Sequence, residues 1–152
     1  MSTVEQFIIL DETYLCQIAE LFKNAFGCAP WNDDWRDEIQ LKEYIKEISC
    51  SFHSLNYGLF IDGKLSAISL GMIRHWWEGT NYRIEEFCVS PDLQGKGVGS
   101  RFMKMIEKDV QKRGLSGIFL QTDHDKPSYQ FYQKNGFHQL VSDVSFYKKV
   151  DD

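Results

Sequence analysis

One stretch limits the possible folds of this chain more than any other, because a strand, a glycine-rich turn and a helix follow one another without a break. The strand ends at Pro91, and Gly95, Gly97 and Gly99 then lead directly into an amphipathic helix. Glycines let backbone amides approach a ligand closely and adopt conformations that other residues avoid. The start of a helix adds unpaired N–H groups and the positive end of its dipole. The stretch therefore predicts a site for an anion such as a phosphate or diphosphate.

Two common nucleotide-binding motifs do not fit this turn. A P-loop needs Gly-x-x-x-x-Gly-Lys followed by Ser or Thr, and the turn lacks that pattern. A dinucleotide-binding turn needs Gly-x-Gly-x-x-Gly, whereas Gly95, Gly97 and Gly99 are spaced as Gly-x-Gly-x-Gly. Lys96 and Arg101 lie beside these glycines and offer charge-assisted contacts to an anion. We therefore interpret the turn as a binding site rather than a plain connection.

The apolar periodicity of the chain predicts a single α/β domain over residues 1–152, because no repeat or linker divides it. Asp62-Gly63 is the strongest short hairpin signal. Hairpins make most strand pairs antiparallel, and the helix after the glycine turn makes at least one pair parallel, so the sheet is mixed. We expect strands at 5–11, 56–61, 64–73, 82–90, 116–122, 137–141 and 145–150, and helices at 13–26, from Asp33 or Asp34 to about 50, at 97–113 and at 126–134.

Composition and charge narrow the class of protein further. The net charge of −5 at pH 7 argues against a nucleic-acid-binding face, which needs clustered basic residues, and is compatible with a cationic small-molecule partner. No apolar run is long enough to span a membrane, and the first ten residues do not resemble a secretory signal. The four cysteines form no Cys-x-x-Cys pair, which indicates reduced thiols and no structural zinc site. We therefore expect a cytoplasmic protein that contains no metal and binds neither nucleic acid nor a membrane.

Two short motifs in this chain have a recognisable order and spacing. Gln94-x-x-Gly97-x-Gly99 lies in the turn, and Tyr-x-x-x-Gly-Phe runs from Tyr132 to Phe137. They resemble the landmarks of the GNAT (Gcn5-related N-acetyltransferase) superfamily, whose first motif is written Gln/Arg-x-x-Gly-x-Gly/Ala. The expected order of strands and helices matches that family over nearly the whole chain. The resemblance implies a GNAT-like fold, with a mixed, mostly antiparallel central sheet flanked by helices, and the activity of an acyltransferase.

The resemblance also implies that acetyl-CoA is the co-substrate and that its diphosphate lies on the amides of the turn. Its pantetheine arm is expected along the edge of the strand at 85–90, where the backbone of Val89 would pair with it. Asp125 stands where many relatives have an asparagine that contacts the cofactor. The residues that the resemblance assigns to acetyl-CoA are Phe87, Cys88, Val89, Gln94, Gly95, Lys96, Gly97, Val98, Gly99, Ser100 and Asp125.

Acetyl transfer to an amine requires a base, because an alkylammonium has no free lone pair at neutral pH. Glu85 and Glu86 are adjacent on one predicted strand, and alternation directs their side chains to opposite faces. Relatives that acetylate aminoglycosides resemble this strand in an Ile/Met-Asp-Gln pattern whose Asp corresponds to Glu85. We therefore predict Glu85 as the base, with Glu86 as the alternative. The resemblance further implies that Tyr132 protonates the departing CoA thiolate. We expect direct transfer without an acetylated Cys88, because alternation turns Cys88 away from Glu85.

The acceptor side is predicted from aromatic and acidic residues between the first two helices, where GNAT proteins shape their acceptor pocket. Trp31, Asp34 and Trp35 lie in this segment, and Trp76 ends a neighbouring strand. Together with Glu86 they would suit a cationic amine. We expect the primary amine of a small molecule such as an aminoglycoside or a polyamine. Peptide or protein amines as acceptors, and a non-catalytic CoA-binding sensor as the function, remain open alternatives. The sequence also leaves a homodimer open.

Overall fold

The computed structural model describes residues 2–151, which divide into two compact units. The first unit ends at Gln121 and the second begins at Thr122. The first unit contains the sheet and the helices packed on it, and the second contains one further helix. None of the helices within residues 2–151 is both long and apolar enough to cross a membrane. The expectation of one domain over residues 1–152 stays a prediction.

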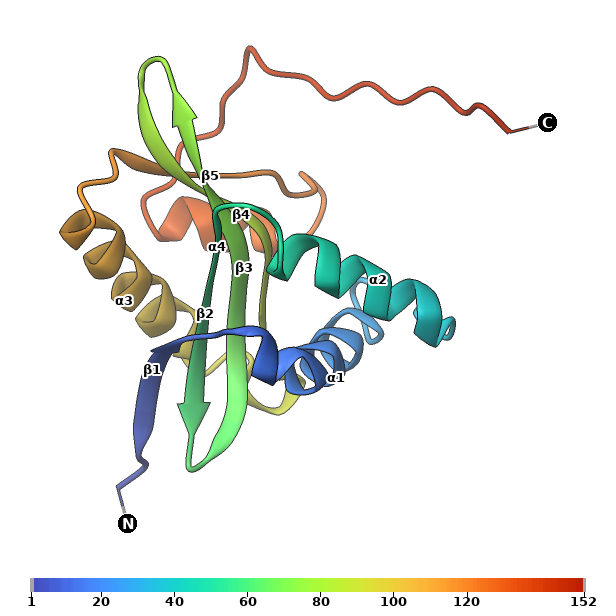
Figure 1. The fold of residues 1–152 in the computed structure, drawn as a ribbon, viewed down its shortest axis with the longest axis vertical. Coiled ribbons are helices and arrows are strands. Elements are labelled where there is room, and N and C mark those ends of the chain that lie inside the picture. Colours follow the sequence, from blue (N-terminus) through green and yellow to red (C-terminus); the bar gives the residue numbers. More distant parts are fainter. Residues whose placement is uncertain (1, 152) are drawn as a thin grey trace. The chain divides into compact units, whose positions relative to one another are not determined.

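A five-stranded sheet forms the centre of the first unit, in the order β1-β2-β3-β4-β5 (Figure 1). Neighbouring strands from β1 to β4 pair antiparallel, and β5 pairs parallel with β4. A parallel pair needs a crossover connection, and the helix of residues 98–112 supplies it. The predicted mixed, mostly antiparallel sheet is therefore confirmed. The strands are β1 (Glu5–Ile9), β2 (Ser54–Ile61), β3 (Lys64–Trp76), β4 (Gly79–Val89) and β5 (Gly117–Leu120).

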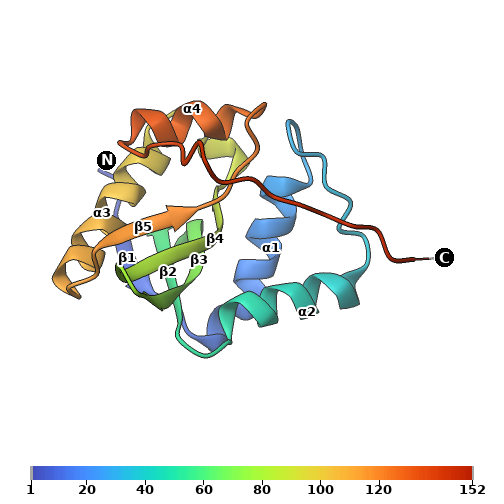
Figure 2. The same cartoon turned by 90° about the horizontal axis from the view of Figure 1, so that it is seen from above.

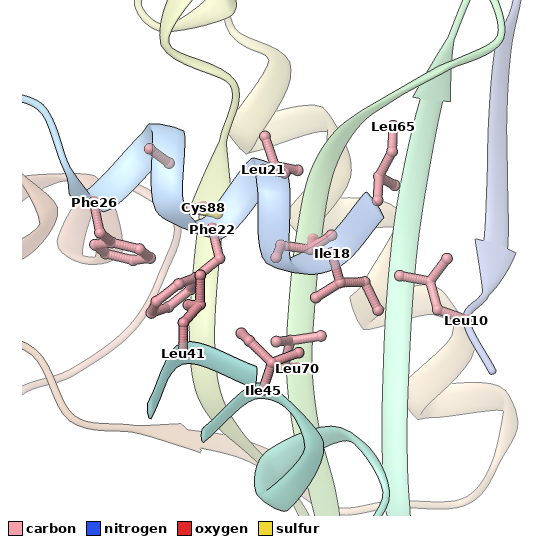
Figure 3. Close-up of a cluster of buried hydrophobic side chains, with 12 residues drawn as sticks. Leu10, Ile18, Leu21, Phe22, Phe26, Leu41, Ile45, Leu65, Leu70 and Cys88 are labelled. Atoms are coloured by element: carbon pink, nitrogen blue, oxygen red, sulfur yellow. The ribbon is translucent and has the colours of Figure 1, made fainter. Parts of the chain in front are cut away.

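Helices of the first unit cover both faces of the sheet (Figure 2). α1 (Leu15–Phe26) and α2 (Glu38–Ser49) pack on one face, and α3 (Val98–Lys112) packs on the other. Apolar side chains of α1, α2, β3 and β4 form one buried cluster, which Figure 3 shows in close-up. On the α3 face, the buried Phe102 stacks against Phe87 of β4, with ring centroids 5.5 Å apart. β4 therefore contributes side chains to two apolar layers, with Cys88 in the cluster under α1 and α2 and Phe87 against α3.

The predicted hairpin at Asp62-Gly63 is confirmed, because this pair connects β2 to β3. The two residues have φ angles of 50° and 81°, which a tight two-residue turn requires. The next hairpin is longer than predicted, since β3 continues to Trp76 and pairs there with Gly79 of β4. Residues 74–76 and 79–81 therefore belong to the two strands, whereas the sequence predicts that they lie in the connection.

The second helix begins later than predicted. Its N-cap is Asp37, whose carboxylate accepts hydrogen bonds from the amides two and three residues further on. The prediction that Asp33 or Asp34 caps this helix is therefore wrong. Asp34 instead accepts hydrogen bonds from the side chain of Arg36 at 2.9 and 2.8 Å. The acidic residues before Asp37 thus belong to the loop between α1 and α2.

A β-bulge interrupts the pairing of β3 with β4. Leu70 pairs with Glu86 and Gly71 pairs with Ile84, so that Glu85 is an extra residue opposite this step of β3. Residues that pair across two strands point to the same face of the sheet, whereas consecutive residues of one strand point to different faces. Since Leu70 and Gly71 are consecutive, their partners Glu86 and Ile84 point to different faces. The prediction of strict alternation, which places Ile84 and Glu86 on one face, is wrong at this point.

Gly71 allows the two strands to come together at the bulge. A Cβ atom there would lie 2.3 Å from the Arg83 carbonyl oxygen and 2.8 Å from the Tyr82 ring, and real Cβ atoms essentially never come so close. The buried side chain of Asn56 stabilises the same place, because its oxygen accepts a hydrogen bond from the Gly71 amide at 3.3 Å. Its nitrogen donates to the Ser49 carbonyl at 2.8 Å. The end of α2 is thereby connected to β3 beside the bulge.

The second unit contains α4 (Pro127–Lys134), as the sequence predicts. Within the described residues, however, 137–141 and 145–150 form no strand, so the predicted final pair of strands is wrong. A strand needs the backbone groups of a neighbouring strand. In this region the Asp143 amide donates a hydrogen bond to the Leu140 carbonyl at 3.1 Å, which closes a turn instead. Figure 1 shows the residues beyond this turn as an extended chain.

We predict that Asn56→Ala lowers the free energy of unfolding by about 2–3 kcal/mol, because the buried Gly71 amide and Ser49 carbonyl lose their side-chain partners. Urea unfolding followed by tryptophan fluorescence measures this change. Asn24→Ala is the matched control, since Asn24 is exposed on α1, and we expect a change below about 0.5 kcal/mol there. A similarly small change in Asn56→Ala would show that these hydrogen bonds do not stabilise the bulge region.

Candidate functional site

The glycine turn joins β4 to α3 and has the backbone geometry of the predicted anion site. Gly95 and Gly97 have φ angles of 76° and 77°, a left-handed conformation that favours glycine. Gly97 is the N-cap of α3 and supplies no capping side chain. The first helical hydrogen bond runs from the Arg101 amide to the Gly97 carbonyl at 3.1 Å. The amides of Val98 and Gly99 therefore precede the hydrogen-bond ladder of the helix, as they do where helices bind anions.

The turn also leaves room for a ligand. A Cβ atom at Gly95 would meet no described atom within 4 Å apart from its chain neighbours, and one at Gly97 would meet the Arg101 guanidinium at 3.8 Å. Lys96 is exposed between them, whereas Arg101 forms an ion pair with Glu5 of β1, at 2.5 Å. The turn therefore fits a diphosphate through its backbone amides and Lys96, while Arg101 is already paired with a carboxylate.

The strand that leads into this turn extends beyond its neighbour. Ile84 of β4 pairs with Leu120, the last residue of β5, so Glu86–Val89 continue past the end of the β4–β5 ladder. The Val89 carbonyl accepts a hydrogen bond from the Gln94 side chain at 3.1 Å, which holds the turn against the end of β4. The edge of a strand that continues past the end of its neighbour is suited to pairing with another extended chain. The pantetheine arm of acetyl-CoA is predicted along this edge.

Glu85, the predicted base, lies in the bulge beside a cation. Its carboxylate accepts a hydrogen bond from Arg83 Nε at 2.9 Å, and its side chain is 34% exposed. The Arg83 guanidinium also lies over the Phe119 ring of β5, 4.8 Å from the ring centroid. The arginine is thus held in place by β5 and engages one of the two carboxylate oxygens of Glu85.

Glu86, the alternative base, has a different environment on the face that α1 and α2 cover. Its carboxylate accepts a hydrogen bond from the Tyr44 hydroxyl of α2 at 2.5 Å. The pKa of Glu86 is raised to about 7, mainly by burial. The Tyr44 hydrogen bond acts in the opposite direction, and the negative charges of Asp33 and Glu85 add to the increase. A carboxyl with this pKa takes up and releases a proton near neutral pH, as a general base must.

Aromatic rings hold Tyr44 in place. The Trp35 ring stacks on the Tyr44 ring with centroids 5.5 Å apart and an interplanar angle of 15°, and Phe22 of α1 packs against both. Burial and the Glu86 carboxylate raise the pKa of Tyr44, so its hydroxyl stays protonated and able to donate. Trp35 Nε1 is buried without a hydrogen-bond partner among the described residues. Trp35 therefore supports the Tyr44–Glu86 pair, and its predicted contact with the acceptor stays a prediction.

The other predicted acceptor residues lie in two different places. Trp31 packs on the end of α1, and Asp34 lies in the same loop in its ion pair. Trp76 is six positions along β3 from Leu70, the partner of Glu86, which corresponds to roughly 20 Å. It is 55% exposed at the end of the β3–β4 hairpin. The structure therefore does not bring Trp76 together with Glu86.

Cys88, two residues from Glu86 on β4, offers no reactive thiolate. Cys88 is 7% exposed and belongs to the buried cluster under α1 and α2. Burial raises the pKa of the Cys88 thiol, with a smaller contribution from the Glu86 charge, so the thiol stays protonated. Among residues 2–151, no group of three or more His, Cys, Asp or Glu side chains is placed to hold a metal ion.

Tyr132 and Asp125 belong to the second unit. Tyr132 lies on α4, and its ring contacts Phe137 edge to face, with centroids 5.4 Å apart. The Phe137 amide also donates to the Tyr132 carbonyl at 3.0 Å, so the Tyr-x-x-x-Gly-Phe motif forms the C-terminal end of α4. Asp125 is exposed before this helix. The role of Tyr132 as proton donor and the contact of Asp125 with CoA stay predictions.

No sequence pattern points to Tyr44 as a site residue. Its spacing from Leu41 and Ile48 predicts only a buried stripe on the second helix. Its partner Glu86 is 42 residues away along the chain. The one available signal is that Tyr44 brings a hydroxyl group into a stripe that is otherwise aliphatic, and a buried hydroxyl needs a partner.

Comparison with known proteins gives a match to the acetyltransferase (GNAT) family over residues 15–137. Matches to individual relatives are shorter. The chain is 36% identical over 56 residues to tRNA(Met) cytidine acetyltransferase TmcA 2 of Saccharolobus solfataricus, covering 37% of this chain and 7% of that protein. It is 29% identical over 66 residues to thialysine N-epsilon-acetyltransferase of Bos taurus, covering 43% of this chain and 39% of that protein. The match therefore spans less than half the length of either relative.

Several solved structures share the fold over almost the whole chain. Aminoglycoside N-acetyltransferase AAC(6')-Iy in complex with CoA has a TM-score of 0.73 at 19% identity and covers 98% of this chain and 97% of that chain. An aminoglycoside acetyltransferase from an uncultured soil metagenomic sample, in complex with sisomicin, has a TM-score of 0.74 at 17% identity and covers 97% of each chain. A possible acetyltransferase from Clostridium difficile has a TM-score of 0.81 at 13% identity and covers 97% of this chain and 99% of that chain. At such identities the similarity shows the fold alone.

We predict that Tyr44→Phe raises the pKa of Glu86 above about 7, because the carboxylate loses the hydrogen bond that stabilises its charged form. An NMR titration of the Glu86 side-chain carboxyl carbon measures this pKa. Tyr14→Phe is the matched control, since Tyr14 packs on Phe60 and should leave the pKa of Glu86 unchanged. An unchanged or lower pKa of Glu86 in Tyr44→Phe would contradict the assignment of this hydrogen bond.

Proposed function

Because the chain belongs to the GNAT acetyltransferase family, we propose that it transfers the acetyl group of acetyl-CoA directly to a primary amine of a small, cationic acceptor. The observation that carries this proposal is the Tyr44–Glu86 pair, a half-buried carboxyl with a pKa of about 7 on the strand that leads into the glycine turn. The amides of the turn would hold the diphosphate of acetyl-CoA. The edge of β4 from Glu86 to Val89 would pair with the pantetheine arm and direct the thioester toward Glu86.

We propose Glu86, rather than Glu85, as the base. The amine nitrogen must lose a proton to attack, and Glu86 would accept that proton directly or through a water molecule. The nitrogen then forms a bond to the thioester carbonyl carbon, and the C–S bond breaks to release CoA as a thiolate. Glu86 has a pKa close to neutral pH, whereas the Glu85 carboxylate is already engaged by Arg83. Efficient proton transfer favours the group whose pKa lies near the working pH.

The departing thiolate needs a proton, and the family resemblance assigns its donation to Tyr132. A lower kcat with unchanged acetyl-CoA binding in Tyr132→Phe would support that role. The protonated, buried thiol of Cys88 supports direct transfer, because an acetyl-cysteine intermediate would require a thiolate. Both steps then take place in one complex of enzyme, acetyl-CoA and acceptor.

The charges around Glu86 support a cationic acceptor. The negative charges of Asp33 and Glu85 both act on Glu86, and the acidic character of this place favours an ammonium group. The aromatic residues Trp35 and Tyr44 lie beside them and are suited to a cation. Similar proteins are named for aminoglycosides and for thialysine, and both compounds carry primary amines. We therefore propose an acceptor of this kind, an aminoglycoside or polyamine-like molecule, ahead of a protein amine.

A turnover screen over different amines tests this function. Thiol release from acetyl-CoA, followed with a thiol-reactive dye, should exceed the rate without amine when an aminoglycoside or spermidine is present. Isothermal titration calorimetry with CoA serves as the control for donor binding. CoA binding without release for any amine would favour a CoA-binding sensor, and release with short peptides alone would move the acceptor to protein amines. Absence of both binding and release would overturn the proposed function.

We predict that kcat/KM rises with pH through about 7, because Glu86 must lose its own proton before it accepts one from the amine. Glu86→Gln should remove this limb of the pH profile and lower kcat by about 10²-fold or more. Glu85→Gln is the matched control, since it changes the adjacent residue in the same way, and it should keep the limb. If Glu85→Gln loses the limb and Glu86→Gln keeps it, Glu85 is the base.

A further inference from the structure

Two arginines lie on the same sheet face as Glu86, between it and the end of the β3–β4 hairpin. Leu70, the partner of Glu86, and Met72 are alternate residues of β3, so their side chains share one face. Arg83 pairs with Met72, and Arg74 follows Met72 by two residues, so both arginines belong to that face. The proposed base and two guanidinium groups therefore occupy successive positions on one sheet surface.

The two guanidinium groups converge on Met72. Arg74 Nη2 lies 3.7 Å from Met72 Sδ, so the Arg74 side chain bends back along β3. Arg83 lies opposite Met72, which makes Arg74 and Arg83 diagonal neighbours on two strands, about 7–8 Å apart at their backbones and within reach of long side chains. Like charges at neighbouring positions of a sheet destabilise it. An anion bound between two guanidinium groups offsets this repulsion.

The two arginines differ in their present partners. Arg83 Nε donates to Glu85 at 2.9 Å, and its guanidinium lies over the Phe119 ring, 4.8 Å from the centroid. Arg74 is exposed, and within residues 2–151 it forms no ion pair. A guanidinium has five N–H donors in a planar fork that fits a carboxylate. Arg83 would therefore orient an anion, and Arg74 would supply positive charge that no acidic side chain balances.

The spacing between Glu86 and the arginines limits the ligand that fits. Leu70 and Met72 are two residues apart along β3, so an amine at Glu86 and an anion at the arginines would be roughly 7 Å apart. In a lysine-type molecule, six bonds of about 1.5 Å each separate the side-chain nitrogen from the carboxylate carbon, and an extended zigzag of these bonds covers that distance. An amine directly next to a carboxylate would be too close.

We propose that the acceptor carries a carboxylate as well as the primary amine, and that Arg74 and Arg83 bind this carboxylate while Glu86 receives the amine. The inference rests on the proposed function, because it names the acceptor class of the same site: amino acids with an amine at the end of the side chain. Such a molecule has two ammonium groups and one carboxylate at neutral pH, so it is a small cation. The N–C bond forms as the C–S bond of acetyl-CoA breaks, CoA leaves as a thiolate, and the amine proton passes to Glu86.

Lysine and cadaverine are matched probes of this site, because cadaverine is lysine without the carboxylate. Thiol release from acetyl-CoA should give a kcat/KM for lysine about 10-fold or more above that for cadaverine. Mass spectrometry should find the acetyl group on the side-chain nitrogen of lysine. Equal kcat/KM values, a preference for cadaverine or acetylation of the α-amine would overturn the inference. Turnover of other amines without turnover of lysine would also overturn it, and would leave the proposed function intact.

Arg74→Gln tests the charged contact at an exposed side chain. It should raise KM for lysine about 10-fold with little change in kcat, so that the ratio of the lysine and cadaverine kcat/KM values falls toward one. Arg83→Gln should lower the same ratio. Lys108→Gln is the matched control, since it removes an exposed positive charge from α3, and it should keep the wild-type ratio. A wild-type ratio in Arg74→Gln would contradict the assigned contact.

Calorimetry separates failure of this inference from failure of the proposed function. In the presence of CoA, the wild type should bind lysine about 10-fold more tightly than cadaverine, and Arg74→Gln should lose this difference. That result in a protein that acetylates no amine would overturn the proposed function and retain the carboxylate site. A wild type that binds lysine no more tightly than cadaverine would overturn the carboxylate site, whatever its activity.

Discussion

The bulge at Glu85 is the constraint on which the candidate site depends, because it determines how two adjacent glutamates are used. Without the extra residue, Glu86 would share a face with Ile84, which instead pairs with Gly71 on the α3 side. With the bulge, Glu86 lies opposite Leu70 on the face that α2 covers, and Tyr44 can reach it. The β4–β5 ladder also ends at Ile84, next to the bulge. One inserted residue thus places a carboxyl at the point where β4 continues past the end of β5.

Burial of Glu86 carries a cost that the rest of the fold must offset. A pKa raised from 4.5 to about 7 means that the ionised carboxylate is less stable in the fold than in water by roughly 3 kcal/mol. The folded protein binds more protons at Glu86 than the unfolded chain does between these two values. The contribution of Glu86 to stability therefore falls as the pH rises through this window, and it is lost above pH 7. The Tyr44 hydrogen bond limits the cost without removing it.

Local chemistry explains which parts of the fold could be predicted from the sequence. The Asp62-Gly63 hairpin, the glycine turn and the helix after it each depend on a few consecutive residues, and all were recognisable. The bulge could not be recognised from the sequence, because it depends on the close approach of Gly71 to the backbone of another strand. The start of α2 was misplaced because several aspartates are chemically suitable caps and only the three-dimensional path of the loop selects Asp37.

The residues of the candidate site divide in the same way. The candidate anion-binding turn follows from the spacing of its glycines, whereas the difference between Glu85 and Glu86 follows from their neighbours in space. The pairing of Tyr44 with Glu86 joins α2 to β4, and no short motif contains both residues. The strands expected at 137–141 and 145–150 show the reverse case, since their residues favour a strand, yet within residues 2–151 they form none.

The loop between α1 and α2 has a consequence for how proteins of this kind diverge. Asp33 and Trp35 of this loop lie near Glu86, while the glycine turn belongs to a separate connection between β4 and α3. Mutations that lengthen the loop or change its charge can therefore accumulate without disturbing the turn. Under the proposed function, descendants of one ancestral chain could take up new amines by this route and keep the same acyl donor.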